Sequence, residues 1–120
     1  MAKLNDIAEM VQVDVSVFGI KRTKADIAAG QTDSSIVAAV TGKKIKVLAL
    51  HAQAGGTATT IVFNSASTAI SPIYANAANG GVVLSFNPAG WFQTNVAEAL
   101  TATTGAGSST GITLTYIEVE

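Results

Sequence analysis

Cysteine is absent from the 120-residue chain, which excludes disulfide bonds, a thiolate nucleophile and cysteine-ligated metals. The single histidine, His51, cannot form a multi-histidine metal site within one chain. No apolar run reaches the roughly 18 residues that a transmembrane helix needs, so no membrane partner is expected. Neither a metal nor another cofactor is expected.

Charge is also scarce. Charged residues make up 12% of the chain, about half of the ~25% that is typical. Seven basic and eight acidic residues give a net charge of −1, without the basic excess of a nucleic-acid binder. We therefore expect no direct contact with nucleic acid. So few charges make a poor surface for a freely soluble monomer, which favours a component of an assembly.

What the chain does contain, from about residue 25 onward, is short β-strands separated by glycine-rich turns. Glycine supplies the positive φ angles that such turns need. About eight short strands at regular spacing predict an all-β, single-domain β-sandwich or barrel over residues 25–120. The expected strands are Ala25–Ala29, Ser34–Val40, Lys44–Gln53, Thr57–Asn64, Ala69–Tyr74, Gly81–Phe86, Ala97–Thr103 and Gly111–Glu120.

Residues 1–24 are predicted to form an extended N-terminal arm. Leu4, Ile7 and Val11 have helical spacing, but one or two turns of helix are not stable alone in water. The following segment, Val13–Val17, alternates valine with polar residues, as in a strand. We therefore expect the arm to become ordered only against a partner.

The densest charge cluster follows this segment and consists of Lys21, Arg22 and Lys24. These side chains could contact DNA phosphates, but no aromatic residue is interleaved with them. Docking onto an acidic protein surface fits better, and a plain solvated linker is the alternative.

Alternation of apolar and polar residues identifies the expected core. Three strands place apolar residues on one face and mostly hydroxyl-bearing residues on the other. The expected core positions are Ile61, Phe63, Val82, Leu84, Phe86, Ile112, Leu114 and Tyr116.

The segment Lys44–Gln53 breaks this rule because both of its faces are apolar. Ile45 and Val47 lie on one face, whereas Leu48 and Leu50 lie on the other. A strand that is apolar on both sides is covered on both sides. We therefore expect the arm or a neighbouring subunit to cover the second face, with Leu48 and Leu50 at a contact between chains.

Residues that could carry chemistry are few. His51 lies in an apolar strand without a recognisable nucleophile motif and is interpreted as a structural or surface residue. Thr41-Gly42-Lys43-Lys44 lacks the earlier glycine of a phosphate loop and is interpreted as a hairpin turn. Glu118 and Glu120 share one strand face and are interpreted as a solubilising tail. No catalytic residue is expected, and an enzyme is disfavoured.

The only aromatic cluster is Trp91-Phe92, which follows the turn Asn87-Pro88-Ala89-Gly90. Two interpretations are open. The aromatic pair could plug one end of the sandwich, or it could be exposed and stack on sugar rings together with the loop Thr103–Gly111.

Several runs resemble small jelly-roll virion proteins of tailed bacteriophages, some of which are capsid decoration (cement) proteins. The similar runs are Val40–Leu50, Ala78–Gly81, Phe86–Phe92, Glu98–Leu100 and Leu114–Val119. The Asn-Pro-x-Gly-Trp-Phe run followed by Glu-Ala-Leu is the most specific of them. The resemblance extends from about Ser34 to the C-terminus. It implies a jelly-roll sandwich with a role in virion assembly, commonly as a trimer, and it transfers no catalytic residue.

The leading hypothesis is a decoration protein on the outer surface of the capsid, with the major capsid protein and its own copies in a homotrimer as partners. The expected interface residues are Leu4, Ile7 and Val11 in arm packing, Lys21, Arg22 and Lys24 in polar docking, and Leu48 and Leu50 between subunits. The alternative is a tail, fibre or baseplate module that binds host glycans.

Overall fold

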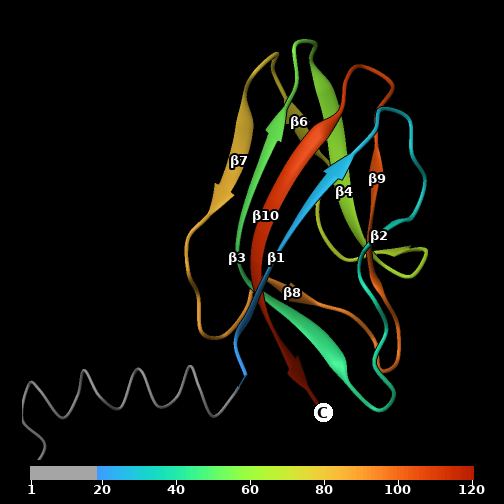
Figure 1. The fold of residues 1–120 in the computed structure, drawn as a ribbon, viewed down its shortest axis with the longest axis vertical. Coiled ribbons are helices and arrows are strands. Elements are labelled where there is room, and N and C mark those ends of the chain that lie inside the picture. The colour runs from blue at the N-terminus through green and yellow to red at the C-terminus, as the bar shows by residue number, and fades with distance from the viewer. Residues whose placement is uncertain (1–18) are drawn as a thin grey trace, which may run out of the picture.

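Ten strands and no helix make up the part of the chain that the computed structural model describes, residues 19–120 (Figure 1). Within these residues no helix is long and apolar enough to cross a membrane. The strands are β1 (Lys21–Ile27), β2 (Ser34–Val37), β3 (Lys44–Ala54), β4 (Thr59–Ser65), β5 (Thr68–Ala69), β6 (Tyr74–Asn76), β7 (Gly81–Leu84), β8 (Phe92–Gln93), β9 (Leu100–Thr104) and β10 (Thr110–Val119).

The strands form two antiparallel sheets. In sheet A the order is β1-β10-β3-β7, and the short β8 pairs with the first half of β3. In sheet B the order is β2-β9-β4-β5, and β6 also pairs with β4. The chain crosses between the sheets repeatedly, so that strands distant in sequence become neighbours.

The pairing is nested from the outside inward. β1 pairs with β10, β2 with β9, β3 with β7 and β4 with β6. A long hairpin that is rolled up into two sheets in this way is a jelly roll. The all-β sandwich predicted from the sequence is therefore confirmed.

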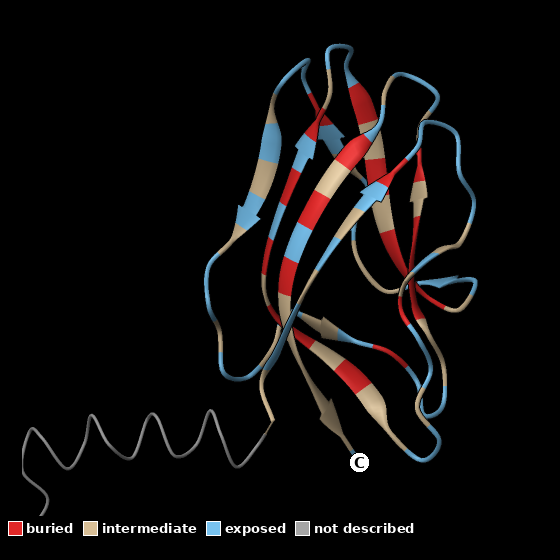
Figure 2. Ribbon diagram, viewed as in Figure 1, coloured by how far each residue is buried: buried red, intermediate tan, exposed pale blue. Residues whose placement is uncertain are grey.

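The core lies between the two sheets and is made of alternating residues from their inner faces. At its centre Phe63 of β4 stacks on Phe92 of β8, with ring centroids 5.5 Å apart, and meets Tyr74 edge-on at 6.2 Å. Alternating buried and exposed segments are visible along β3 and β10 in Figure 2. The fully or nearly fully buried apolar residues include Ile27, Ile45, Val47, Leu50, Ala52, Ile61, Phe63, Leu100, Ala102, Ile112 and Leu114.

A β-bulge explains why β3 is apolar on both faces in the sequence. Thr115 of β10 lies opposite Ala49, but Tyr116 lies opposite Val47, so Leu48 is the extra residue of β3. One inserted residue reverses the alternation. Ile45 and Val47 before the bulge, and Leu50 after it, therefore all belong to the same core.

The bulge corrects the expectation that Leu48 and Leu50 contact another chain. Each side chain is only 3% exposed within the single chain, and Leu50 belongs to the core cluster. Neither residue presents an apolar surface to a partner, so the two-sided pattern requires no second subunit to cover it.

Other differences from the expected strands have local causes. The segment Ala69–Tyr74 is not one strand, because pairing stops between β5 and β6 around Pro72, which has no N–H to donate. Phe86 is 58% exposed, because β7 ends at Leu84 and the alternation does not continue. β8 is too short to be recognised from its sequence pattern.

The beginning of the sandwich also differs from the expectation. β1 begins at Lys21 rather than Ala25, so Lys21, Arg22 and Lys24 belong to a strand that is paired with β10 and not to the arm. The arm residues Leu4, Ile7 and Val11, and the segment Val13–Val17, lie outside the described residues.

Candidate interaction surface

The outer face of sheet A is the part of the described surface that differs most from an ordinary solvated face. Its central row crosses all four strands, from Lys24 through Thr113 and His51 to Val83. A neighbouring row consists of Arg22, Thr115 and Ala49. In these two rows charge is confined to β1, whereas the side chains toward β7 are small, apolar or, as in His51, aromatic.

The middle of this face is a shallow depression with a volume of about 420 Å³. Threonines and an alanine form much of its floor, because the larger residues of β3 and β10 point into the core. Such a floor allows a partner to approach the sheet closely. The depression is lined by Arg22, Ala49, Leu50, His51, Val83, Leu84, Ser85, Phe86, Thr113, Leu114 and Thr115.

Exposed apolar side chains lie along the β7 side of this face. Val83 is 69% exposed, Phe86 58% and Trp91 45%. The Trp91 indole N–H donates to the Ser85 carbonyl at 2.7 Å, which ties the end of β7 to the turn before β8. Exposed apolar residues that are grouped in this way are typical of interaction sites, whereas single ones need no explanation.

The three basic residues of β1 have different environments. Lys21 pairs with Glu118 at 2.9 Å, and this hydrogen bond, followed by the Coulomb attraction, raises the pKa of Lys21. Lys24 lies 3.4 Å from Asp26, and both side chains are largely exposed. Exposed pairs of this kind are worth little. Arg22 forms no ion pair with residues 19–120, so of these three cations it is the one best placed to meet a partner's carboxylate.

Lys21 also differs from Arg22 and Lys24 in direction. Successive residues of a strand point to opposite faces. Arg22 and Lys24 therefore point to the outer face of sheet A, whereas Lys21 points away from it. The structure brings only two of the three predicted docking cations together on this surface.

The outer face of sheet B offers fewer free polar groups. The Asn64 amide nitrogen donates to the Asp33 carboxylate at 3.0 Å and to the Thr103 hydroxyl at 3.1 Å. The Thr101 hydroxyl donates to the carbonyl of Ala66 at 2.6 Å. Because these groups already bond to one another, they have less to offer a partner than the outer face of sheet A.

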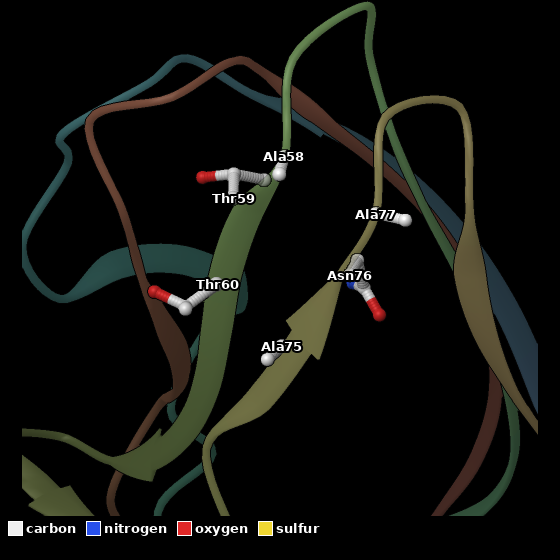
Figure 3. Close-up of a pocket in the computed structure, with 6 residues that line it drawn as sticks. All are labelled: Ala58, Thr59, Thr60, Ala75, Asn76 and Ala77. Carbon is white, nitrogen blue, oxygen red and sulfur yellow. The ribbon is translucent and has the colours of Figure 1, made fainter.

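A second hollow, of about 360 Å³, lies beside the paired strands β4 and β6 (Figure 3). Thr59 and Asn76 are opposite each other across these strands. Within the described part of the chain, the Thr59 hydroxyl and the Asn76 amide nitrogen are buried without hydrogen-bond partners. None of the described residues that line this hollow is ionisable. Its lining residues are Ala58, Thr59, Thr60, Ala75, Asn76 and Ala77.

The two parts of the expected glycan site lie far apart. Phe92 is packed against Phe63 in the core, so Trp91 alone remains exposed. Trp91 hydrogen-bonds to Val47 early in β3, whereas the β9–β10 loop lies beside Gly55, just beyond the other end of that strand. Eight residues of strand separate them by about 26 Å. Trp91 and the loop Thr103–Gly111 therefore cannot form one small site.

The remaining candidate residues of the sequence are placed individually. His51 is exposed in the central row of the outer face of sheet A. A turn is present at Thr41 and Gly42, with the Lys43 N–H bonded to the Val40 carbonyl at 3.0 Å. It is not the predicted hairpin turn, because β2 and β3 belong to different sheets. Glu120 pairs with Lys43 at 3.3 Å. Residues 19–120 contain no group of three or more His, Cys, Asp or Glu residues that could hold a metal ion.

The apolar β7 side was missed by the sequence reasoning. Alternation with the predicted core residues Val82, Leu84 and Phe86 places Val83 on the face that is predicted to be polar, whereas the structure exposes both Val83 and Phe86. The chain has no Lys, Arg, Asp or Glu between Lys46 and Glu98, but this uncharged stretch includes strands of both sheets and therefore does not single out β7.

No protein-family model and no curated protein sequence matches the chain. One similar solved structure is a chain from the Bacillus endospore appendages, which form a family of disulfide-linked pili. Its sequence is 18% identical, the match covers 83% of this chain and 85% of that chain, and the TM-score is 0.47. A chain from the virus-like particle of the extra small virus of the giant freshwater prawn Macrobrachium rosenbergii is 14% identical, with 85% and 80% covered and a TM-score of 0.40. Both similar structures belong to assemblies, but with TM-scores below 0.5 neither likeness defines what this chain does.

Proposed function

We propose that the protein is a structural virion component, namely a capsid decoration protein that binds the outer surface of the assembled head as a homotrimer. Its partners are the major capsid protein and its own copies. The proposal is supported by the resemblance of residues 34–120 to small phage virion proteins, and by the low charge of the chain.

The observation that carries the proposal is the outer face of sheet A. A sheet face with a shallow depression and a floor of small residues can lie close against a large, ordered partner. Val83 and Phe86 supply apolar area that gains free energy when it is removed from water. Arg22 adds one charged contact at the opposite margin. An apolar patch with a polar margin is typical of protein interfaces.

Decoration stabilises a shell by mass action. A protein that binds assembled capsid and not dispersed subunits shifts the equilibrium toward the intact particle. A trimer engages several neighbouring subunits, so weak single contacts are strengthened by avidity. In this proposal the arm residues Leu4, Ile7 and Val11 order against the capsid and enlarge the contact.

The test uses capsids that lack this protein, to which purified protein is added back. Bound protein is expected to saturate at a fixed number of copies per particle and to raise the temperature at which the capsids open. Protein that ignores the capsids, or that binds without saturation and without stabilising them, would contradict the proposal.

Two matched pairs of variants test the assigned surface. Phe86→Ser is expected to weaken attachment, whereas Ile73→Ser, which changes another exposed apolar residue between two strands of sheet B, is expected to leave it unchanged. Arg22→Ala is expected to weaken attachment most at low salt, where charges are screened least. Lys21→Ala serves as its control, because Lys21 points away from this face.

Glycan binding remains the second candidate, and it rests on Trp91 alone. The indole is 45% exposed and is fixed in position by its hydrogen bond to Ser85. A fixed, exposed indole can stack on a sugar ring. Binding to a glycan array that disappears in Trp91→Ala, together with failure to bind capsids, would favour a tail, fibre or baseplate module.

A further inference from the structure

The two edges of sheet A are protected to very different degrees. Edge strands present unpaired backbone groups, and proteins commonly protect them with charged residues. At one edge β1 has Lys21, Arg22, Lys24 and Asp26. At the other edge β7 has no charge, and no strand lies beyond it in Figure 1. The unprotected edge is therefore β7.

The register with β3 defines which backbone groups of β7 are open. The Ala54 N–H bonds to the Gly80 carbonyl at 2.7 Å. Because hydrogen-bonded residues alternate along an antiparallel pair, Val82 and Leu84 also bond to β3. The N–H and C=O groups of Gly81 and Val83 therefore point away from the sheet. The open edge ends at Ser85, whose carbonyl accepts the Trp91 indole N–H.

We propose that Val13–Val17 of a second copy of this chain adds to β7 as an antiparallel strand, with Val15 opposite Val83. The segment alternates valine with aspartate and serine, and its five residues match the open stretch Gly81–Ser85. Residues directly opposite each other in a sheet share a face. In this register the three valines extend the apolar row of Val83 and Phe86, and Asp14 and Ser16 lie on the other face.

The donor is a second copy because a chain cannot reach its own β7. An added strand would lie four strand spacings from β1, which is about 19 Å. Four residue steps connect Val17 to Lys21, and a fully extended chain covers about 14 Å in four steps. The segment therefore falls short on its own sheet, whereas a neighbouring chain can present it freely.

Such a contact joins two different surfaces of identical chains. Contacts of this head-to-tail type form a closed ring where the rotation between neighbours closes. The arrangement provides a route to the proposed homotrimer, but it does not depend on capsid binding. Failure of the pairing and failure of the decoration role are separate results, because the pairing is tested with the purified chain alone.

The absence of native cysteine permits a direct test. Chains that carry only Val15→Cys are mixed with chains that carry only Val83→Cys and are oxidised. Opposed residues of this type have Cα atoms about 5.5 Å apart, within the range of about 4.4–6.8 Å for a disulfide. We expect a mixed Val15→Cys/Val83→Cys dimer on a non-reducing gel, and at least a tenfold lower yield when Ser16→Cys replaces Val15→Cys.

Three outcomes of this cross-linking would overturn the proposal. Preferential linkage of Val83→Cys chains to one another would mean that β7 pairs with the β7 of a second copy. Efficient linkage within a monomer that carries both substitutions would mean that the segment pairs with its own chain. Equal yields from Val15→Cys and Ser16→Cys would mean random collision.

A proline at position 83 tests the backbone pairing without a cross-link. The Val83 N–H points away from β3, so Val83→Pro removes a donor from the open edge and leaves the β3–β7 hydrogen bonds in place. We expect Val83→Pro to be a folded monomer by circular dichroism and light scattering, and Val83→Thr to retain the oligomer of the original chain. A folded Val83→Pro protein with an unchanged oligomer would refute strand addition.

Discussion

Two phenylalanines that look equivalent in the sequence are expected to differ strongly in their contribution to stability. Phe63 is fully buried and contacts both Phe92 and Tyr74, whereas Phe86 is 58% exposed. Replacing a buried phenylalanine by alanine typically costs about 3–5 kcal/mol, from lost transfer energy and the cavity that remains. We therefore expect about 4 kcal/mol for Phe63→Ala. For Phe86→Ala we expect less than about 1 kcal/mol.

Thermal and chemical denaturation measure both values. A chain of 120 residues has an unfolding entropy near 0.25 kcal/mol/K, so about 4 kcal/mol corresponds to a Tm that is lower by about 15 °C. Urea unfolding should give the same difference with an unchanged m-value. Similar losses of stability for the two variants would mean that Phe86 is packed as tightly as Phe63. That result would refute the claims that β7 ends at Leu84 and that Phe86 is an exposed part of the outer face of sheet A.

Two further predictions concern hydroxyl groups. Thr94→Val removes the hydroxyl that accepts the buried Ile45 N–H at 2.9 Å, and we expect it to lower the free energy of unfolding by about 1–3 kcal/mol. Thr59→Val removes a buried hydroxyl that has no partner among the described residues. In the same urea titrations we expect this variant to be as stable as the original chain or more stable. Burial raises the pKa of Tyr74 above its ordinary value of 10.0, so its contribution to stability is present below about pH 10 and is lost as the pH rises through the folded-state pKa. Tyr74→Phe should therefore reduce the alkaline loss of stability, and an identical pH profile for the variant would contradict this.

The sheet strands could be predicted because alternation is a local property. Ile61, Phe63, Ile112 and Leu114 have the period of two that a half-buried strand requires, and the structure buries all four. The turns could be predicted equally well, because glycine and asparagine are common at positions of positive φ such as Gly42 and Asn79.

The bulge and the interaction surface could not be predicted in the same way. A bulge depends on the register between β3 and β10, which are more than fifty residues apart in the sequence, so alternation alone places Leu48 and Leu50 on the face opposite Ile45 and Val47. The outer face of sheet A joins residues from four strands, and no local pattern connects Arg22 with Phe86. Lys21, Arg22 and Lys24 can be assigned to faces only once the start of β1 is known. Residue propensities predict the ends of strands poorly.

The nested strand order has a consequence for how the chain folds. β10 lies in the interior of sheet A, between β1 and β3, although it is the last of the ten strands in the sequence. β1 must therefore wait for a partner that follows about ninety residues later, and sheet A cannot close before β10 has been synthesised. Proteins dominated by such distant pairings fold in milliseconds to seconds rather than microseconds. During this delay the inner edges of β1 and β3 are open, so crowded, partly folded chains are most prone to pair incorrectly before β10 inserts.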